Sequence, residues 1–378
     1  MKIIVAGDFV PQYRVADLLQ SEKYSDVFPL DLVTVIKSAD FSFLNLECPI
    51  ASSSFKPILK CGSNLKSDLT MLEAIRYLGF KGVTLANNHI NDFGADGIAK
   101  TISSCVDAGF KIVGCGMNTN EAGKTLYVDL EGEVLAVINC CEQEFSIASR
   151  RQPGANHLDP IKQYYAIKEA KAKADYVLVI VHGGHEYCRM PSVRMQDTYR
   201  FFVDAGADVV VNHHQHCYSG YENYNGKHVF YGLGNFCFDD PTLTDSPIWT
   251  EGYLLEIDFG KNTTCNIHPY LQCGAHPSVQ LLPQESFDGE LQNLNKIIAD
   301  SKQLRDYMSS YYKQSEKAIS SFIEPFHNRW IKAAQRRRLL PSFIFKSWIP
   351  FLYDVIFCES HRDKLEYYLQ NQMNENNE

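Results

Sequence analysis

The chain has 378 residues, of which 45% are hydrophobic and 12% aromatic, and its formal net charge at pH 7 is −9. This composition indicates a globular protein with one large or two medium domains. The acidic balance excludes general nucleic-acid binding, which usually requires a basic surface, so we expect no nucleic-acid partner.

The 12 cysteines are scattered through apolar segments and include no Cys-x-x-Cys motif. Buried free thiols therefore explain them better than a disulfide framework. The first residues are typical of a strand rather than of a signal peptide. No segment reaches the roughly 18 uninterrupted apolar residues of a membrane-spanning helix. These features predict a cytoplasmic protein.

Apolar strands and amphipathic helices alternate along most of the chain. In chain order, the pattern predicts strand 3–6, helices 15–19 and 30–37, strand 41–47, helix 69–78, strand 82–86, helix 98–108, strand 111–113, a hairpin over 125–139, a loop over 142–159, helix 160–174, strand 176–181, helix 193–205, and strands 209–211, 229–231, 253–257 and 264–270. The alternation is typical of parallel strands, to which the hairpin adds antiparallel ones. We therefore predict an α/β fold with a mixed sheet.

Polar side chains follow most of these strands. Parallel strands end at one edge of a sheet, where ligands bind in open α/β folds. Each acid or asparagine taken alone could equally be a helix cap or a turn residue. The residues that follow strands in this way are Asp8, Glu47, Asn88, His89, His182, His214 and His216. We expect them to converge on one site.

The strand 209–211 stops at Asn212, which is followed by His213, His214 and His216. In an extended backbone, His214 and His216 point the same way because side chains alternate with period two. Two imidazoles on one side provide half of a metal site. The alternative is a polar strand end with hydrogen-bonded histidines.

The converging set combines carboxylates, an amide and imidazoles without a thiolate. Such donors suit Mn, Fe or Zn in a reactive site rather than structural zinc. One or two divalent ions are expected, and a pair about 3.5–4 Å apart would activate water and polarise a phosphoryl or acyl oxygen. Asp92 could orient the imidazole of His89. Hydrolysis is the predicted chemistry.

Several motifs together resemble a known family. They are Asn45-Leu46-Glu47 with Pro49, Ala86-Asn87-Asn88-His89 with Asp92 and Gly94, the segment 182–187, His213-His214-Gln215-His216, and Leu233-Gly234-Asn235-Phe236. Their order and spacing over about residues 1–270 resemble the bacterial capsule synthesis protein CapA family, named for poly-γ-glutamate capsule synthesis. That family is similar in fold to calcineurin-like metallophosphatases.

The resemblance implies a four-layer αββα double β-sandwich of metallophosphatase type, which we assign to residues 1–280. It implies metal ligation by Asp8, Glu47, Asn88, His182, His214 and His216, with Glu47 as the better candidate for a bridge. It makes His89, with Asp92, the catalytic general acid or charge stabiliser. The residues assigned to substrate binding are His185, Glu186, Tyr187, His213 and Asn235.

The predicted function is a metal-dependent hydrolase that acts on a phosphoester or amide bond in capsule, exopolysaccharide or poly-γ-glutamate synthesis. Its partner would be the capsular polymer or a phosphorylated or amide precursor. The chain departs from the metallophosphatase pattern at Val10, where that fold normally has a histidine, and from the family motifs at Gly183 and Asn212. These departures keep open an alternative, a non-catalytic binding or assembly factor with a degenerate metal site.

Residues 281–378 lie outside the resemblance and are predicted as a helical extension, with a helix over 290–312 and a disordered tail from 371. Segment 329–351 mixes Arg336-Arg337-Arg338 with tryptophan and phenylalanine. This mixture suggests peripheral binding to the anionic inner face of a membrane. The alternative is an extension that packs on the catalytic domain.

Overall fold

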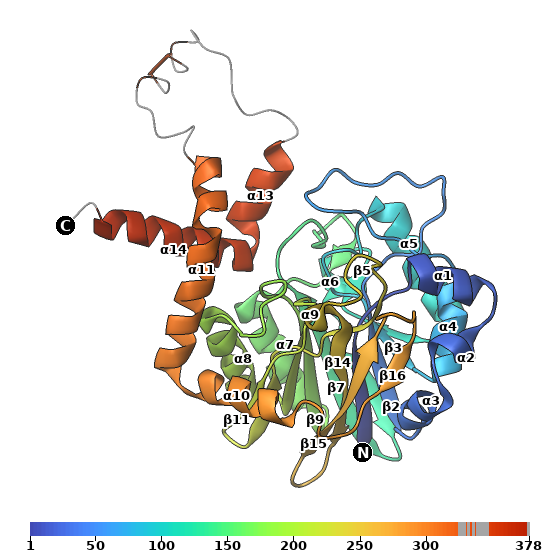
Figure 1. Cartoon of the computed structure of the whole chain (residues 1–378). Helices are drawn as coiled ribbons and strands as arrows, with labels where there is room; N and C mark the ends of the chain where they lie inside the picture. The colour runs from blue at the N-terminus through green and yellow to red at the C-terminus, as the bar shows by residue number, and fades with distance from the viewer. Residues whose placement is uncertain (324–329, 331–332, 335–336, 338–347, 376–378) are drawn as a thin grey trace.

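The computed structural model describes residues 1–323, 330, 333–334, 337 and 348–375. Within them, two large sheets pack together and helices cover both outer faces (Figure 1). This arrangement confirms the predicted four-layer αββα architecture. The strand pattern alone predicted one mixed sheet, whereas the strands are divided between two.

The first sheet has eight strands and is centred on β1. β1 pairs in parallel with β2 and β13 and in antiparallel orientation with β14. The order is β16, β15, β14, β1, β2, β3, β4, with β13 also on β1. The strands are β1 (Lys2–Val10), β2 (Phe41–Leu46), β3 (Gly82–Thr84), β4 (Lys111–Val113), β13 (Asn235–Phe238), β14 (Glu251–Asp258), β15 (Thr264–Gln272) and β16 (Val279–Leu281).

The second sheet has six strands in the order β11, β12, β10, β9, β7, β6. Its four central strands are parallel, and the two edge strands are antiparallel to their neighbours. The strands are β6 (Leu126–Leu130), β7 (Glu133–Cys141), β9 (Tyr176–His182), β10 (Val209–His213), β11 (Tyr221–Tyr224) and β12 (Lys227–Phe230). A small third sheet pairs β5 (Cys115–Gly116) with β8 (Gly154–Ala155). Of these two strands, β8 lies in segment 142–159, which is predicted as a loop.

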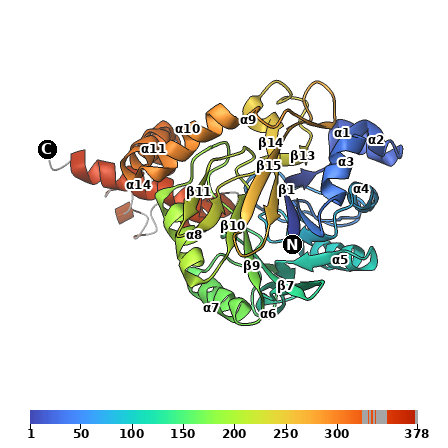
Figure 2. The same cartoon turned by 90° about the horizontal axis from the view of Figure 1, so that it is seen from below.

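Side chains of β1 alternate between two hydrophobic cores. Ile3 and Val5 pack in the core shared with the second sheet, whereas Ile4 and Ala6 pack against the outer helices. Figure 2 shows α1 to α5 on one side of the sheets and α7 and α8 on the other. The helices are α1 (Tyr13–Gln20), α2 (Tyr24–Val27), α3 (Leu30–Lys37), α4 (Thr70–Leu78), α5 (Gly94–Asp107), α6 (Thr119–Ala122), α7 (Pro160–Lys171), α8 (Val193–Ala205) and α9 (Pro247–Thr250).

Several of these helices begin and end at residues that favour a helix boundary. The carboxylate of Asp159 accepts hydrogen bonds from two backbone N–H groups at the start of α7, and the hydroxyl of Ser192 caps α8 in the same way. α4 ends at Gly79, whose φ of 94° is the left-handed conformation that glycine adopts without strain. Local sequence therefore fixes the helices that hold the strands in place.

β1 extends beyond its apolar core and contains Asp8, although the pattern predicts Asp8 just after the strand. The pairing register with β2 shifts between Ala6 and Asp8, and the register with β13 shifts between Asp8 and Phe9. The backbones come very close here, because a Cβ atom at Gly7 would lie 1.8 Å from the carbonyl oxygen of Gly234. Such irregularities re-aim side chains, and this one brings Asp8 to the candidate site.

The extension consists of helices that pack on the sheets' outer helices and on one another. The predicted helix over 290–312 is divided at Asp300, whose carboxylate accepts hydrogen bonds from the backbone of Lys302 and Gln303 and caps a new helix. α14 continues to Glu375, beyond the start of the predicted tail, because it packs along α11. The helices are α10 (Asp288–Ala299), α11 (Ser301–Ile323), α13 (Ile349–Phe357) and α14 (Glu359–Glu375).

Arg194 of α8 connects the extension to the sheets. Its Nη2 lies 2.7 Å from Glu142 Oε1, and its Nε lies 3.0 Å from Asp363 Oδ1 on α14. Glu359 accepts a 2.7 Å hydrogen bond from the backbone N–H of Gln143. These contacts support the alternative in which the extension packs on the part of the chain that forms the two sheets.

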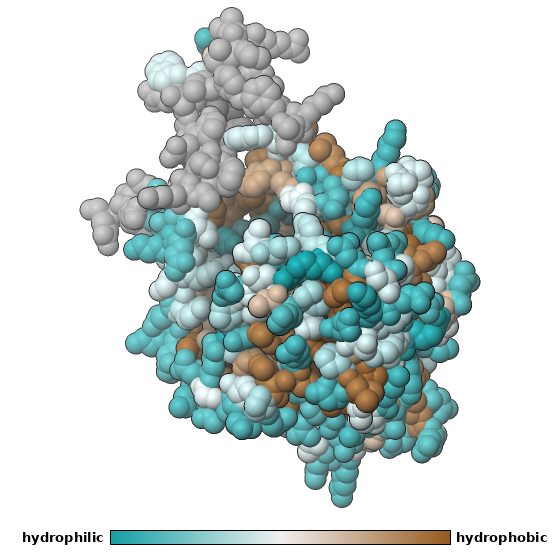
Figure 3. Space-filling model, turned by 45° about the vertical axis from the view of Figure 1, so that its right-hand side comes forward, coloured by the Kyte–Doolittle hydropathy of each residue, from teal (hydrophilic) through white to brown (hydrophobic). Residues whose placement is uncertain are grey.

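Most of segment 329–351 lies outside the described residues, so its membrane contact stays a prediction. In the part of the chain that the structure describes, each helix is too short or too polar to cross a bilayer. The face in Figure 3 is mostly hydrophilic, with hydrophobic side chains in separate patches.

Candidate metal centre and catalytic site

The predicted site residues come together where strands of both sheets end. Asp8 lies on β1, Glu47 follows β2 and Asn88 follows β3, all in the first sheet. His182 ends β9 and His214 follows β10 in the second sheet. Their side chains are all nearly inaccessible to solvent. The residues therefore converge as predicted, but between two sheets instead of along the edge of one.

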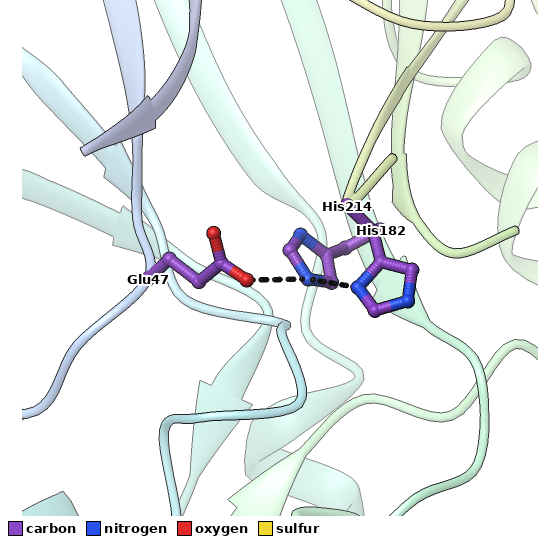
Figure 4. Close-up of side chains that lie close together, drawn as sticks. All are labelled: Glu47, His182 and His214. Atoms are coloured by element: carbon purple, nitrogen blue, oxygen red, sulfur yellow. Dashed lines mark hydrogen bonds and ion pairs between the residues drawn. The ribbon is translucent and has the colours of Figure 1, made fainter. Parts of the chain in front are cut away.

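A first group of possible ligands consists of Glu47, His182 and His214, whose ligand atoms lie within 4.8 Å of one another (Figure 4). The Nε2 atom of His182 lies 3.3 Å from Glu47 Oε1 and 3.2 Å from His214 Nδ1. It also lies 3.0 Å from Asn88 Oδ1. One ring nitrogen can donate at most one proton, so it cannot satisfy all of these neighbours. A cation would satisfy them together.

A second group consists of Asp8, Glu47 and His216, again within 4.8 Å of one another. His216 Nδ1 lies 3.6 Å from Asp8 Oδ2 and 4.0 Å from Glu47 Oε2. Glu47 thus belongs to both groups and offers a different carboxylate oxygen to each. This geometry is what a carboxylate bridging two ions requires.

Electrostatics inside the site also favour a bound cation. Burial, followed by the negative charge of Asp8, raises the pKa of Glu47 well above its usual value. Neither carboxylate oxygen of Glu47 has a hydrogen-bond partner among the described residues. A buried carboxylate without a partner is costly, and a divalent cation removes that cost. The donor set therefore fits the predicted metal.

The nearby ionisable groups favour their metal-binding forms. Burial lowers the pKa of His182 well below its usual value and also lowers that of His214, so both imidazoles are neutral. Burial opposes ionisation of Asp8, but contacts with His213, His182 and His216 overcome it and hold its pKa below the usual value. Neutral imidazoles beside an ionised carboxylate are ready to bind a cation.

The backbone of the histidine cluster is not extended. His214 has a φ of 89° and His216 a φ of 55°, both in the left-handed region that non-glycine residues rarely adopt. The two side chains do face one site, as predicted, but the predicted cause, an extended backbone, is wrong. They come together because the chain turns after β10, which places their ring centroids 6.0 Å apart. Such strained residues concentrate at functional sites.

His89 and Asp92 form a pair beside the ligand groups. His89 Nδ1 lies 2.7 Å from Asp92 Oδ2, which also accepts a 2.6 Å hydrogen bond from the backbone of Leu65. Burial lowers the pKa of His89 although the contact with Asp92 opposes this, so the ring is held neutral and oriented. The Nε2 atom is left for other contacts.

Sequence analysis missed Lys60, a buried lysine in the loop between β2 and α4. Its ammonium group forms an ion pair with Asp92 and lies 3.0 Å from His89 Nδ1. The lysine sits in a loop without hydrophobic periodicity, so nothing in its local sequence identifies it. It enters the site only because the loop folds over His89.

Four residues of the candidate site, Asn88, His89, His214 and His216, line a cavity of about 690 Å³. The extension completes its wall with Tyr311 of α11 and with His361 and Lys364 of α14. Glu186 and Tyr187, which were assigned to substrate binding, also line it. A cavity built from both parts of the chain therefore lies beside the candidate centre.

The other three residues predicted to bind substrate, His185, His213 and Asn235, contact protein side chains. His185 lines the cavity, but its buried ring is directed at the extension, with Nε2 3.1 Å from Tyr312 Oη. His213 Nδ1 lies 3.5 Å from Asp8 Oδ1. Asn235 Oδ1 lies 2.9 Å from His216 Nδ1. His213 and Asn235 thus lie against possible ligands and do not line the cavity.

The departure at Gly183 has a structural reason. A Cβ atom at Gly183 would lie 2.5 Å from Cγ of Glu142, so a larger side chain fits only if Glu142 moves. Glu142 holds Arg194, which in turn holds Asp363 of the extension. The glycine therefore leaves room for the contact that docks α14. Asn212 joins neighbouring segments by donating to the carbonyl oxygens of Gly183 and Tyr231.

Residues 2–240 match the family described as bacterial capsule synthesis protein PGA_cap. The chain belongs to this family. Capsule biosynthesis protein CapA of Bacillus anthracis is 34% identical over 247 residues, covering 63% of this chain and 60% of that protein. PGA biosynthesis protein CapA of Bacillus subtilis is 30% identical over 258 residues, covering 66% of each. The PGA_cap chain thus spans less than two thirds of the length of these relatives.

Among solved structures, the chain is similar to a 5'-nucleotidase precursor from Thermus thermophilus, with a TM-score of 0.43 and 15% identity. That likeness covers 78% of this chain and 57% of the other.

Proposed function

We propose that this PGA_cap family member is a metal-dependent hydrolase that cleaves a phosphoester or amide bond in a capsular polymer or its precursor. The observation that carries the proposal is the position of Glu47, which is shared by two groups of possible ligands. His89, which is paired with Asp92, lines the same cavity as His214 and His216 of these groups.

The residues that would hold the ions are Asp8, Glu47, Asn88, His182, His214 and His216. Oxygen and imidazole nitrogen donors without a thiolate suit Mn, Fe or Zn. When bound, such ions polarise a phosphoryl or acyl oxygen and lower the pKa of water. His213 would orient Asp8 through the contact described above.

His89 would deliver the proton needed by the leaving group from its protonated form, which Asp92 favours and burial opposes. Its Nδ1 is held by Asp92, which leaves Nε2 for the substrate. Lys60 would position this pair through its contacts with both side chains. The four-layer fold thus supplies metal ligands from both sheets and an acid from the loop after β3.

The substrate would be the polymer or precursor handled by capsule synthesis. The names of the relatives from Bacillus anthracis and Bacillus subtilis refer to capsule and PGA biosynthesis. A cavity of about 690 Å³ has the size of a small-molecule site, so it would enclose a chain end or a small precursor. We also propose that segment 329–351 holds the protein against an anionic membrane surface, which its basic and aromatic composition supports.

The test is an activity panel with protein freed of metal and then reloaded with Mn²⁺, Fe²⁺ or Zn²⁺. Substrates are p-nitrophenyl phosphate, bis(p-nitrophenyl) phosphate and γ-linked glutamate oligomers. The proposal expects turnover of at least one substrate class, dependent on metal and lost in a His89→Gln variant that keeps its metal. If wild type binds metal but turns over none of them, the binding or assembly role is favoured instead.

A further inference from the structure

A second cluster of possible metal ligands lies at the corner between α13 and α14, outside the candidate metal centre. Asp354, Cys358 and His361 each direct one ligand atom into this corner, and the three atoms lie within 4.8 Å of one another. Figure 1 shows the two helices meeting there. The chain reverses between the helices, so residues four and three positions apart come together.

The carboxylate and the thiol are both buried, and the thiol sulfur of Cys358 lies 3.2 Å from Ser360 Oγ. Cys358 is 1% exposed and Asp354 is 6% exposed. Asp354 Oδ2 lies 2.9 Å from His361 Nδ1. Asp354 Oδ1 is buried and has no hydrogen-bond partner among the described residues. An ordinary ion pair between Asp354 and His361 explains one carboxylate oxygen but leaves the other without a partner, which is costly.

The donor types differ from those of the candidate metal centre. One thiol, one imidazole and one carboxylate form a set that zinc accepts readily, with a fourth position left to water or another ligand. Asp354 and His361 also line the cavity of about 690 Å³, so that fourth position is next to it. Glu144, from the segment after β7, lines the same cavity and lies 3.8 Å from His214 Nε2. The corner therefore lies near the candidate centre but shares no ligand with it.

We propose that Asp354, Cys358 and His361 bind one zinc ion, which fastens the corner of α13 and α14 beside the cavity. The ion gives the unpartnered carboxylate oxygen a ligand role and replaces a proton on the imidazole. It would hold the extension in the position that completes the cavity wall. The inference does not depend on the proposed hydrolase activity, because it concerns only metal binding by these three residues.

The test uses Co²⁺, which replaces zinc and shows a sulfur-to-cobalt charge-transfer band in the near ultraviolet only when a thiolate is a ligand. The candidate metal centre has no cysteine among its possible ligands, so the band reports on the corner alone. Full-length protein freed of metal is titrated with Co²⁺ at mildly alkaline pH, because binding must displace protons. We expect the band in wild type and in a His182→Ala/His214→Ala variant.

Cys358→Ser should abolish the band and remove one equivalent of zinc per chain, with the rest of the metal retained. His361→Ala, at a half-exposed position, is a second variant that leaves the buried thiol in place. His361→Ala should weaken zinc affinity more than the roughly 10–100-fold caused by removing a residue that only hydrogen-bonds to a metal ligand. Cys265→Ser, on the distant strand β15, is the matched control and should keep the band. Cys61, which lines the same cavity, offers another thiol, and Cys61→Ser tests it. The proposal is overturned if wild type shows no band, or if the band persists in Cys358→Ser or disappears only in Cys61→Ser.

Discussion

Glu47 Oε1 lies 3.3 Å from His182 Nε2, although the two residues belong to different sheets. The contact joins the end of β2 to the end of β9 at the interface of the two sheets. In the absence of a cation, burial raises the pKa of Glu47 and lowers that of His182, so the ion pair between them is disfavoured. The stability of this interface should therefore depend on metal.

Glu47→Gln should separate the effect of metal from the effect of the fold. Without metal, the variant should be at least as stable as wild type, because it replaces a buried carboxyl group that lacks partners with a neutral amide. With metal at about 100 times its dissociation constant, wild type should gain about 2.7 kcal/mol and Glu47→Gln much less. Thermal unfolding with and without metal measures both. Equal stabilisation of the two proteins by metal would contradict the bridging role.

His89→Gln should retain metal and lose activity by about 10²–10⁴-fold, the usual contribution of a general acid. Lys60→Met should also slow turnover without loss of metal, since it removes the ion pair that orients Asp92. Lys56→Met, in the same loop but exposed, is the matched control. Steady-state rates on any substrate found in the panel provide the measurement. Wild-type turnover by His89→Gln would show that the histidine does not donate the proton.

Stability should fall below neutral pH through His185. Burial, with the nearby positive charges of Lys364 and Arg194, lowers its pKa well below the usual value although Asp363 Oδ2 lies 3.6 Å away. Below about pH 6.5, His185 therefore binds a proton in the unfolded chain but stays neutral in the folded chain. The free energy of unfolding should fall with decreasing pH by up to about 1.4 kcal/mol per unit for this group.

His185→Gln removes the titrating group but keeps a side chain that can bond to Tyr312. Chemical unfolding at a series of pH values should give a shallower slope for this variant than for wild type. His276→Gln, at an exposed position, should keep the wild-type slope. Identical slopes for wild type and His185→Gln would rule out His185 as the source.

The basic segment 329–351 should bind anionic vesicles at low salt. Each basic residue near such a surface contributes about 1 kcal/mol, so binding should be reversible and weakened by salt. An Arg336/Arg337/Arg338→Glu variant should remain in the supernatant during co-sedimentation, and neutral vesicles should not retain wild type. If wild type also stays in the supernatant with anionic vesicles, the membrane contact is absent.

The local sequence predicted most of the strands and helices and the polar residues at the strand ends. Strands, helices and the polar residues at strand ends follow from hydrophobic periodicity and capping, so Asp8, Glu47 and His182 could be found without a structure. Residues placed by long-range packing could not. Lys60 reaches His89 through a loop without a pattern, and the left-handed backbone at His214 depends on the turn that follows β10.

In the extension, too, long-range packing could not be predicted from the local sequence. Its helices are recognisable from their period, but the docking of Asp363 on Arg194 joins segments far apart in the chain. The packing of α14 on α11 also extends a helix into the predicted tail. Neither contact has a local signal that sequence analysis could detect.

The most direct test of the metal centre is the metal content of purified protein by elemental analysis, after loading and removal of excess ions. The measurement is made in a Cys358→Ser background so that the corner of α13 and α14 does not contribute. We predict one or two ions per chain when Glu47, His182 and His214 are intact, and nearly none in a folded Glu47→Ala/His182→Ala/His214→Ala variant. Equal metal content in the two proteins would contradict the account.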